Sequence, residues 1–273
     1  MNLLPDARSQ LRFADDASRL SVRLRRFAAV TAKIVLSAGE SVRKQSEGQL
    51  KVMNSHPEIR AVVFDFDGLM LNTEDVFDLA GIELMARRNL LMTDEIRHGM
   101  MGRRPVEAFT ALKAMTGITD RLEDLMMETR ELFEAIAEDR LAAMPGLFEF
   151  LELVESCDLP RAVATSSPRA YLTPLLHKFD LFHRFHFTLT AEDVTHGKPH
   201  PEIYLAAAKQ LNVDPSQMLV LEDSETGTRA AAAAGAFIVS IPNRHTEAGD
   251  FSLSRMKIPS LQDSRLHDLL RKL

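Results

Sequence analysis

The chain has 273 residues, of which 45% are hydrophobic and 26% are charged, and these values exclude disordered and fibrous proteins. A net charge of −6, no Trp and only 2 Tyr argue against a nucleic-acid or membrane-surface partner. The single cysteine excludes an internal disulfide bond and a zinc site built on several thiolates. We therefore expect a cytoplasmic protein, monomeric or weakly dimeric.

The first 55 residues differ in charge from the rest of the chain. They hold ten Lys or Arg and five Asp or Glu, a balance of +5, so the remainder must carry −11 to give the total of −6. One amphipathic helix is predicted over residues 17–36, followed by a polar linker over residues 41–49. Thr31 and Lys33 interrupt the apolar run, which argues against a secretory signal, and no run reaches the roughly 20 apolar residues of a membrane span.

Three interpretations of this segment are open. It is a helical or disordered appendage, an organelle-type presequence, or sequence upstream of a true start at Met53. We favour the first and the third, because Met53 lies only eight residues before Ala61, where the first predicted strand begins. Residues 1–55 are therefore assigned as an N-terminal appendage.

The most informative motif is an apolar strand, residues 61–64, that ends in Asp65, Phe66, Asp67 and Gly68. Such a strand is typical of the centre of a parallel sheet, and open α/β sheets place their active sites at the carboxyl ends of the strands. Two carboxylates held there repel each other unless a cation or a shared proton offsets their charge. The motif indicates a divalent metal, a nucleophile and a proton-transfer group, although a turn or helix cap uses the same residue types.

The remaining pattern divides the chain into a core and an insertion. Residues 71–145 show successive helical apolar faces, separated by breaks at Gly102, Pro105 and Gly117, and predict a helical cap. From residue 146 onwards short apolar strands alternate with helices. We expect strands over 161–165, 185–189, 218–221 and 237–241, and helices over 147–155, 171–178, 201–210 and 227–234 with Gly235 as the last helix's cap. The predicted fold is α/β, a doubly wound parallel sheet formed by residues 56–70 and 146–273 with the cap inserted.

Three further polar clusters follow predicted strands or lie in loops of the core: Thr165 and Ser166, Lys198 within Gly-Lys-Pro, and Glu222 with Asp223. The Thr165 hydroxyl and the Ser166 amide can hold phosphoryl oxygens, and Lys198 can neutralise the charge that builds up during phosphoryl transfer. Each cluster alone is equally explained by a helix cap or a solvated charge. Their common position at one edge of the sheet favours a shared site.

The same clusters provide oxygen ligands for Mg²⁺. Asp65, the backbone carbonyl of Asp67 and Asp223 are hard oxygen donors, and Glu222 is a further candidate ligand. Asp67 could reach the leaving oxygen of a substrate as an acid, since it lies two residues beyond Asp65 at the same strand end. The expected partner is a small-molecule phosphate ester.

At residues 59–241 the chain resembles the haloacid dehalogenase superfamily, through Asp65-Phe66-Asp67-Gly68, Thr165-Ser166, Lys198 and Glu222-Asp223 in this order. The insertion is similar to the helical cap of the β-phosphoglucomutase-like branch, and several short pieces look most like the pseudouridine-5′-phosphatase type. The resemblance implies a Rossmannoid core in which Asp65 forms an aspartyl-phosphate. It also implies that Asp67 protonates the leaving oxygen and then activates water.

Within that resemblance the activities are distinguished by single residues. Dehalogenases generally lack the second acid, whereas Asp67 is present, and the phosphonate-cleaving relatives carry a cap lysine that residues 76–89 lack. Sugar phosphomutases usually have a histidine where this chain has Phe77. We therefore expect a phosphatase of a small metabolite, with a sugar phosphomutase as the alternative and a non-catalytic binding module as a third possibility from another class.

Substrate choice is expected to depend on the cap. Arg103 and Arg104 follow a glycine turn, and Arg169 follows the second motif, so each guanidinium is a candidate contact to substrate hydroxyls or a second phosphate, with a solvated surface role as the alternative. Gly68 is a further candidate contact to substrate. The predicted hinges between cap and core are residues 69–73 and 143–146.

Overall fold

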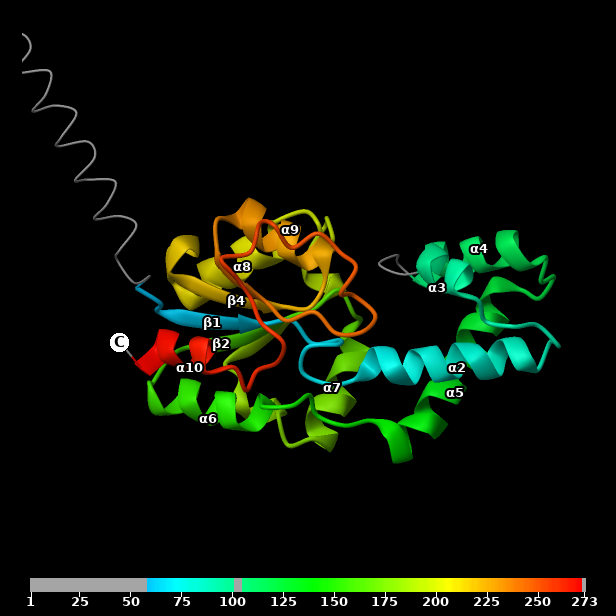
Figure 1. Ribbon diagram of the computed structural model, residues 1–273, viewed down its shortest axis with the longest axis horizontal. Coiled ribbons are helices and arrows are strands. Elements are labelled where there is room, and N and C mark those ends of the chain that lie inside the picture. Colours follow the sequence, from blue (N-terminus) through cyan, green and yellow to red (C-terminus); the bar gives the residue numbers. More distant parts are fainter. Residues whose placement is uncertain (1–57, 101–104, 272–273) are drawn as a thin grey trace, which may run out of the picture. The chain divides into compact units, whose positions relative to one another are not determined.

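The core of the protein is a six-stranded parallel sheet (Figure 1). The computed structural model describes residues 58–100 and 105–271. The strands follow the order β3-β2-β1-β4-β5-β6 across the sheet. Their bounds are β1 Ala61–Phe64, β2 Arg161–Ala164, β3 Phe187–Leu189, β4 Met218–Glu222, β5 Phe237–Ser240 and β6 Met256–Lys257. The predicted doubly wound α/β fold is confirmed.

The register of the central strands determines where the polar motifs meet. Phe64, the last residue of β1, lies opposite Val163 of β2 on one side and Leu221 of β4 on the other. Every residue of β1 and β4 is buried, which is why both are continuous apolar runs rather than alternating ones. The residues that follow these strands therefore emerge side by side at one edge of the sheet.

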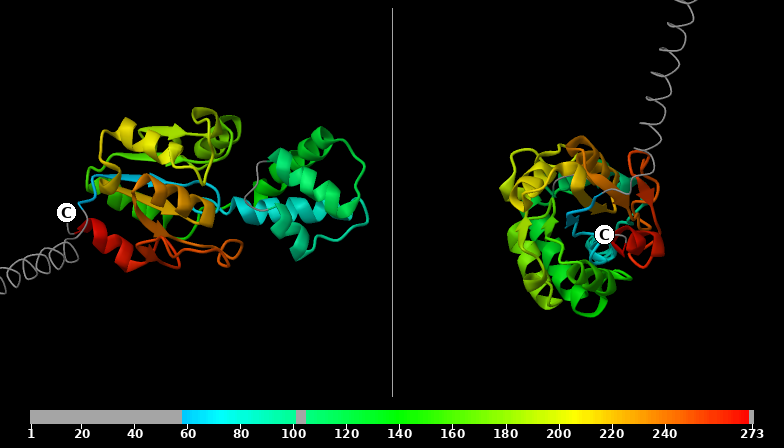
Figure 2. Two further views of the ribbon diagram at one scale, coloured as in Figure 1. Left: turned by 90° about the horizontal axis from the view of Figure 1, so that it is seen from above. Right: turned by 90° about the vertical axis from the view of Figure 1, so that its left-hand side faces the viewer.

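Helices cover both faces of this sheet, as Figures 1 and 2 show. One face packs against α6 (Leu147–Ser156), α7 (Arg169–Lys178) and α10 (Ser264–Arg271), and the other against α8 (Glu202–Leu211) and α9 (Glu225–Ala234). The alanines of α9 allow a close approach to the sheet, and Gly235 ends that helix in the left-handed conformation with a φ of 84°, as predicted. Three short 3₁₀ turns, η1 (Phe182–Arg184), η2 (Ala191–Asp193) and η3 (Pro215–Gln217), complete the connections.

Among the described residues between β1 and α6, the chain forms α2 (Thr73–Ala86), α3 (Asp94–Met100), α4 (Pro105–Thr116) and α5 (Leu122–Arg140). They share a hydrophobic core of their own, to which Leu84, Leu112, Leu125 and Phe133 contribute. The predicted helical insertion is therefore present, and its boundaries at residues 71 and 145 stay a prediction. None of the helices among residues 58–100 and 105–271 is long and apolar enough to cross a membrane.

The two chain segments that lead into and out of the insertion are hydrogen-bonded to each other. The Asn72 side chain accepts from the amide of Ala142 at 2.7 Å and donates to the carbonyl of Arg140 at 3.2 Å. The amide of Met144 donates to the carbonyl of Met70 at 2.9 Å. An Asn is well suited to this position because it can donate and accept at once, which an ionised Asp cannot.

Some elements differ from the sequence predictions. The helix predicted over residues 171–178 already begins at Arg169, and the strand predicted over residues 185–189 begins only at Phe187. The strand β6 and the helix α10 were not predicted. A strand of two residues, such as β6, is too short to show a period in the sequence. The helix predicted over residues 17–36, the assigned appendage 1–55, Arg103 and Arg104 lie outside the described residues.

Gly146 provides a test of how the start of α6 packs. It has a φ of 89°, and a Cβ placed there would lie 2.6 Å from the Gln262 amide nitrogen and 2.7 Å from the Leu261 carbonyl carbon. We expect Gly146→Ala to lower the free energy of unfolding by about 2–4 kcal/mol, from backbone strain and overpacking together. The matched control is Gly235→Ala, with a φ of 84° and no atom within 4 Å of the added Cβ, which should cost only about 1 kcal/mol. Urea unfolding followed by circular dichroism measures both, and equal losses would contradict the packing argument.

Candidate active site

The site begins at the end of β1, where Asp65 is 7% exposed and Asp67 follows in a turn. The Asp65 amide donates to the carbonyl of Leu221 at 3.0 Å, which continues the β1–β4 pairing by one residue. The turn needs Gly68, because its φ is 74° and a Cβ there would lie 2.5 Å from Asp223 Oδ2. The glycine therefore lets the first motif approach the carboxylate that follows β4.

Lys198 lies between two buried carboxylates. Its Nζ donates to Asp65 Oδ1 at 2.5 Å, to Glu222 Oε1 at 2.6 Å and to the carbonyl of Ala164 at 3.0 Å, and its side chain is 5% exposed. Burial by itself would lower the pKa of Lys198, but the Asp65 and Glu222 carboxylates raise it well above its ordinary value. Lys198 is therefore held as a charged ammonium against Asp65.

Hydrogen bonds occupy both oxygens of Glu222. Oε1 accepts from Lys198 and from the Tyr204 hydroxyl of α8, and Oε2 accepts from the Ser224 hydroxyl at 3.1 Å. A Cβ at Gly227 of α9 would lie 1.8 Å from Oε1, so only glycine fits against this carboxylate. The assignment of Glu222 as a metal ligand stays a prediction, and the structure shows that one of its oxygens also accepts a hydrogen bond from Lys198.

Asp223 faces the first motif from the end of β4 and is 2% exposed. The Asn243 side-chain amide, from the loop after β5, lies 2.9 Å from Asp223 Oδ2, 2.8 Å from Glu74 Oε2 and 3.3 Å from the Gly68 carbonyl. Burial, followed by the charges of Glu74 and Asp65, raises the pKa of Asp223 well above its ordinary value. Asn243 thus links Asp223, at the end of β4, to Glu74 in α2, the first helix of the insertion.

The acids together carry more negative charge than Lys198 offsets. One oxygen each of Asp65, Glu222 and Asp223 lie within 4.8 Å of one another, and all three residues are buried. Burial also raises the pKa of Asp65 well above its ordinary value, against the opposing effect of Lys198. One oxygen of Asp65 and one of Asp223 make no hydrogen bond to the described residues. This donor set fits a hard divalent cation that prefers carboxylate and carbonyl oxygens.

Asp67 contacts hydroxyl groups, whereas Asp65 contacts the Lys198 ammonium. Its Oδ2 accepts from the Ser167 hydroxyl at 2.6 Å and from the Thr165 hydroxyl at 3.3 Å, and its Oδ1 accepts from the Tyr171 hydroxyl at 3.1 Å. The predicted Thr165 is therefore at the site. Ser166 is exposed, and its amide has no acceptor among the described residues, so it stays available to a ligand. Ser167 and Tyr171 were not predicted as site residues.

Tyr171 also contacts the helical insertion. Its ring centroid lies 5.8 Å from that of Phe77 in α2 and 5.6 Å from that of Phe133 in α5, and the two phenylalanines are 4.3 Å apart. Burial, followed by the charge of Asp67, raises the pKa of Tyr171 above its ordinary value, so the hydroxyl remains a hydrogen-bond donor. The insertion therefore contacts the residue that donates to Asp67.

Arg169, one of the arginines predicted to bind substrate, contacts neither Asp65 nor Asp67 in the part of the chain that the structure describes. Arg169 forms an ion pair with Asp193, its amide lies 3.2 Å from both carboxylate oxygens of Glu192, and its guanidinium lies 3.4 Å from the Thr188 hydroxyl. These contacts are with the β3–η2 side of the sheet and not with Asp65 or Asp67. Arg103 and Arg104 lie outside the described residues.

Known proteins resemble this chain in sequence and in fold. A family model described as haloacid dehalogenase-like hydrolase matches residues 59–235. A phosphorylated carbohydrates phosphatase of Thermotoga maritima is 33% identical over 177 residues, which cover 65% of this chain and 82% of that protein. Hexitol phosphatase B of Escherichia coli strain K12 is 31% identical over 232 residues, covering 80% of this chain and all (100%) of that protein.

A solved structure, CbbY of Rhodobacter sphaeroides in complex with phosphate, is 25% identical with a TM-score of 0.66. The similarity covers 75% of this chain and 96% of that chain. The family match spans the first motif, the insertion and the residues after β4, so it includes all of the acids described above. The chain therefore belongs to the haloacid dehalogenase-like hydrolases and is a phosphatase-type enzyme related to β-phosphoglucomutase and the sugar-phosphate phosphatases.

Proposed function

We propose that this enzyme hydrolyses the phosphate monoester of a small sugar or polyol through an aspartyl-phosphate on Asp65. The observation that carries the proposal is the contrast between two acids in one turn. Asp65 faces a buried ammonium, at 2.5 Å from Lys198 Nζ, while Asp67 faces three hydroxyl groups. A nucleophile needs neighbouring positive charge to approach a phosphate, and a proton carrier needs hydrogen-bond partners that orient it.

In the first step, an Asp65 oxygen forms a bond to phosphorus while the bond from phosphorus to the ester oxygen breaks. Lys198 offsets the negative charge that gathers between the carboxylate and the phosphoryl group. The Thr165 hydroxyl, at 3.3 Å from Asp67 Oδ2, and the Ser166 amide, which has no acceptor among the described residues, are our candidate donors to the phosphoryl oxygens. Asp67 gives its proton to the leaving oxygen, so the alcohol departs neutral.

In the second step, Asp67 is a carboxylate and takes a proton from water. The water oxygen then bonds to phosphorus, and the bond between phosphorus and Asp65 breaks. Phosphate leaves, and Asp67 is again protonated for the next substrate. The hydroxyls of Ser167 and Tyr171 support this role, because they can hold the Asp67 side chain in one orientation through both steps.

We further propose that the site holds Mg²⁺ through Asp65, Asp223 and the backbone carbonyl of Asp67. One oxygen each of Asp65 and Asp223 has no hydrogen-bond partner among residues 58–100 and 105–271, which supports this assignment, while Glu222 is better explained as the partner of Lys198. When bound, Mg²⁺ supplies positive charge to the phosphoryl oxygens and reduces the repulsion between substrate and carboxylates.

The substrate class rests on the relatives. The Thermotoga maritima and Escherichia coli proteins are named as phosphatases of phosphorylated carbohydrates and of hexitols. A polyol or sugar presents several hydroxyl groups, for which Arg103 and Arg104 remain candidate partners in the insertion. Arg169 is a weaker candidate, because Asp193 and Glu192 already occupy its polar groups.

The nucleophile assignment is tested by Asp65→Asn. We expect Mg²⁺-dependent phosphate release from p-nitrophenyl phosphate to fall by about three orders of magnitude or more, because the amide cannot form the aspartyl-phosphate. The matched control is Asp180→Asn, an exposed residue with a φ of 56°, a conformation that Asn also adopts readily. An unchanged rate in Asp65→Asn would remove Asp65 from the mechanism.

The role of Tyr171 is tested by Tyr171→Phe with two substrates. Loss of one hydrogen bond to Asp67 should reduce kcat/KM for an alkyl phosphate, such as a hexitol phosphate, by roughly 10-fold. Nitrophenolate leaves without protonation, so kcat/KM for p-nitrophenyl phosphate should change little. The chain's other tyrosine is the control: Tyr204 donates to Glu222, and Tyr204→Phe should slow both substrates alike. Equal losses in Tyr171→Phe would contradict the assignment to leaving-group protonation.

Phosphatase and phosphomutase are separated by their products. The mutase alternative is disfavoured because Phe77 packs against Phe133 and Tyr171 and offers no group for proton transfer. With β-glucose 1-phosphate and Mg²⁺, we expect the products glucose and free phosphate. A phosphate assay measures the phosphate, and an enzyme-coupled assay for glucose 6-phosphate should detect none. Accumulation of glucose 6-phosphate instead would establish the mutase.

A further inference from the structure

A second group of possible metal ligands lies on the loop that carries Lys198. His196 and His200 flank this loop residue on either side, and Glu202 begins α8. His196 Nδ1 lies 3.0 Å and His200 Nδ1 lies 3.8 Å from Glu202 Oε2, and the two imidazole centroids are 4.7 Å apart. One ligand atom from each of the three side chains falls within 4.8 Å of the others.

These separations are close to what a tetrahedral metal requires. With metal–ligand bonds of about 2.0–2.1 Å, neighbouring ligand atoms lie roughly 3.4 Å apart. The two imidazoles and the carboxylate therefore need only small side-chain rotations to bind one ion. Two hydrogen bonds would be given up if both Nδ1 atoms bind: the one from the Glu202 amide to His200 Nδ1 at 3.3 Å, and the one between His196 Nδ1 and Glu202 Oε2 at 3.0 Å.

Backbone groups already hold the carboxylate in position. The amide of Thr195 donates to Glu202 Oε1 at 2.8 Å, and the amide of His196 donates to Oε2 at 2.9 Å. The first of these hydrogen bonds contributes most to lowering the pKa of Glu202 to about 2, so the group is an anion at neutral pH. Such outer contacts fix the orientation of a ligand in metal sites.

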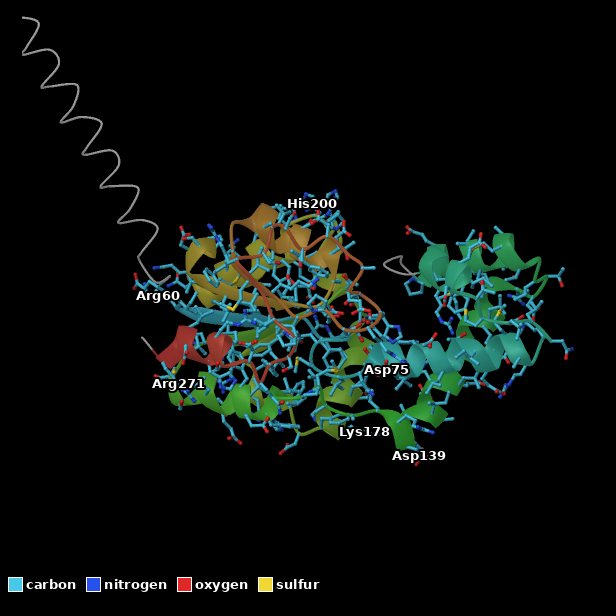
Figure 3. All side chains as sticks on the ribbon, in the orientation of Figure 1. Arg60, Asp75, Asp139, Lys178, His200 and Arg271 are labelled. Carbon is cyan, nitrogen blue, oxygen red and sulfur yellow. The ribbon has the colours of Figure 1, made fainter. Side chains whose placement is uncertain are left out.

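We propose that His196, His200 and Glu202 form a surface site for one divalent transition-metal ion, best matched by Zn²⁺, with water in the fourth position. Two imidazoles with a carboxylate are ligands that zinc accepts readily, whereas Mg²⁺ prefers oxygen ligands alone. The side chains of His196 and His200 are 64% and 52% exposed, so an ion can reach them directly from solvent. Figure 3 shows His200 at the periphery of the core.

This site is separate from the buried acids, although the two share one loop. Lys198 lies two residues from each histidine, and its side chain is buried beside Asp65 while the histidines are exposed. A bound ion would thus join the residues on both sides of Lys198. The inference concerns metal binding alone, so it does not depend on the proposed phosphatase mechanism.

The test is a calorimetric titration of the full chain with ZnCl₂ in a buffer containing excess MgCl₂, which occupies the oxygen site. Wild type should bind one more equivalent of Zn²⁺ than the double variant His196→Ala/His200→Ala. The control, His183→Ala, removes an exposed histidine from elsewhere on the surface and should bind as wild type does. Equal stoichiometry and affinity in wild type and the double variant would overturn the proposal.

A second measurement covers the case in which the double variant does not fold. Co²⁺ replaces Zn²⁺ in tetrahedral sites and then absorbs visible light, so wild type with CoCl₂ and excess MgCl₂ should develop an intense absorption band that added Zn²⁺ abolishes. The conservative single variant His200→Gln should lose this band while keeping the wild-type circular dichroism. Retention of the full band in a folded His200→Gln variant, or no band in wild type, would contradict the assignment.

Discussion

The buried contact of Lys198 with Asp65 and Glu222 is the interaction on which the rest of the site depends. An ammonium and two carboxylates removed from water are costly unless each is paired and hydrogen-bonded, and loss of one partner leaves an unpaired charge. The three residues come from different segments: the end of β1, the loop before α8 and the end of β4. Tyr204 and Ser224 satisfy the remaining bonds of Glu222, which keeps the ammonium directed at Asp65.

The two acids of the first motif are distinguished by their surroundings rather than by their type. Asp65 meets the ammonium of Lys198, while Asp67 meets the hydroxyls of Thr165, Ser167 and Tyr171, which follow β2 in the chain. This asymmetry is the physical basis for separate proposed roles in attack and proton transfer. Because Tyr171 packs against Phe77 and Phe133, the packing of the inserted helices and the orientation of Asp67 depend on one residue.

Those site residues that directly follow a strand could be predicted, because an apolar run that ends in a polar group is a local signal. Lys198 was predicted from its Gly-Lys-Pro loop, and the structure places it against Asp65. Tyr171, Asn243 and Glu74 could not be predicted in the same way, since a tyrosine in a helix or an asparagine in a loop has no local pattern that indicates a site. The assignment of Glu222 as a metal ligand stays a prediction, and the hydrogen bonds from Lys198 and Tyr204 to one of its oxygens could not be predicted from the sequence.

The sequence by itself determined the fold class, the inserted helices and the chemical nature of the site, because the alternation of apolar runs and their polar ends are properties of short segments. Only the tertiary structure decided which donor meets which acid. Arg169 follows a motif residue closely in the chain, yet it pairs with Asp193, while Asn243 lies far along the chain from Asp223 and Glu74 and contacts both. The physical reason is that parallel strands bring their carboxyl ends together whatever their separation in sequence, and the packing of the helices then directs each side chain.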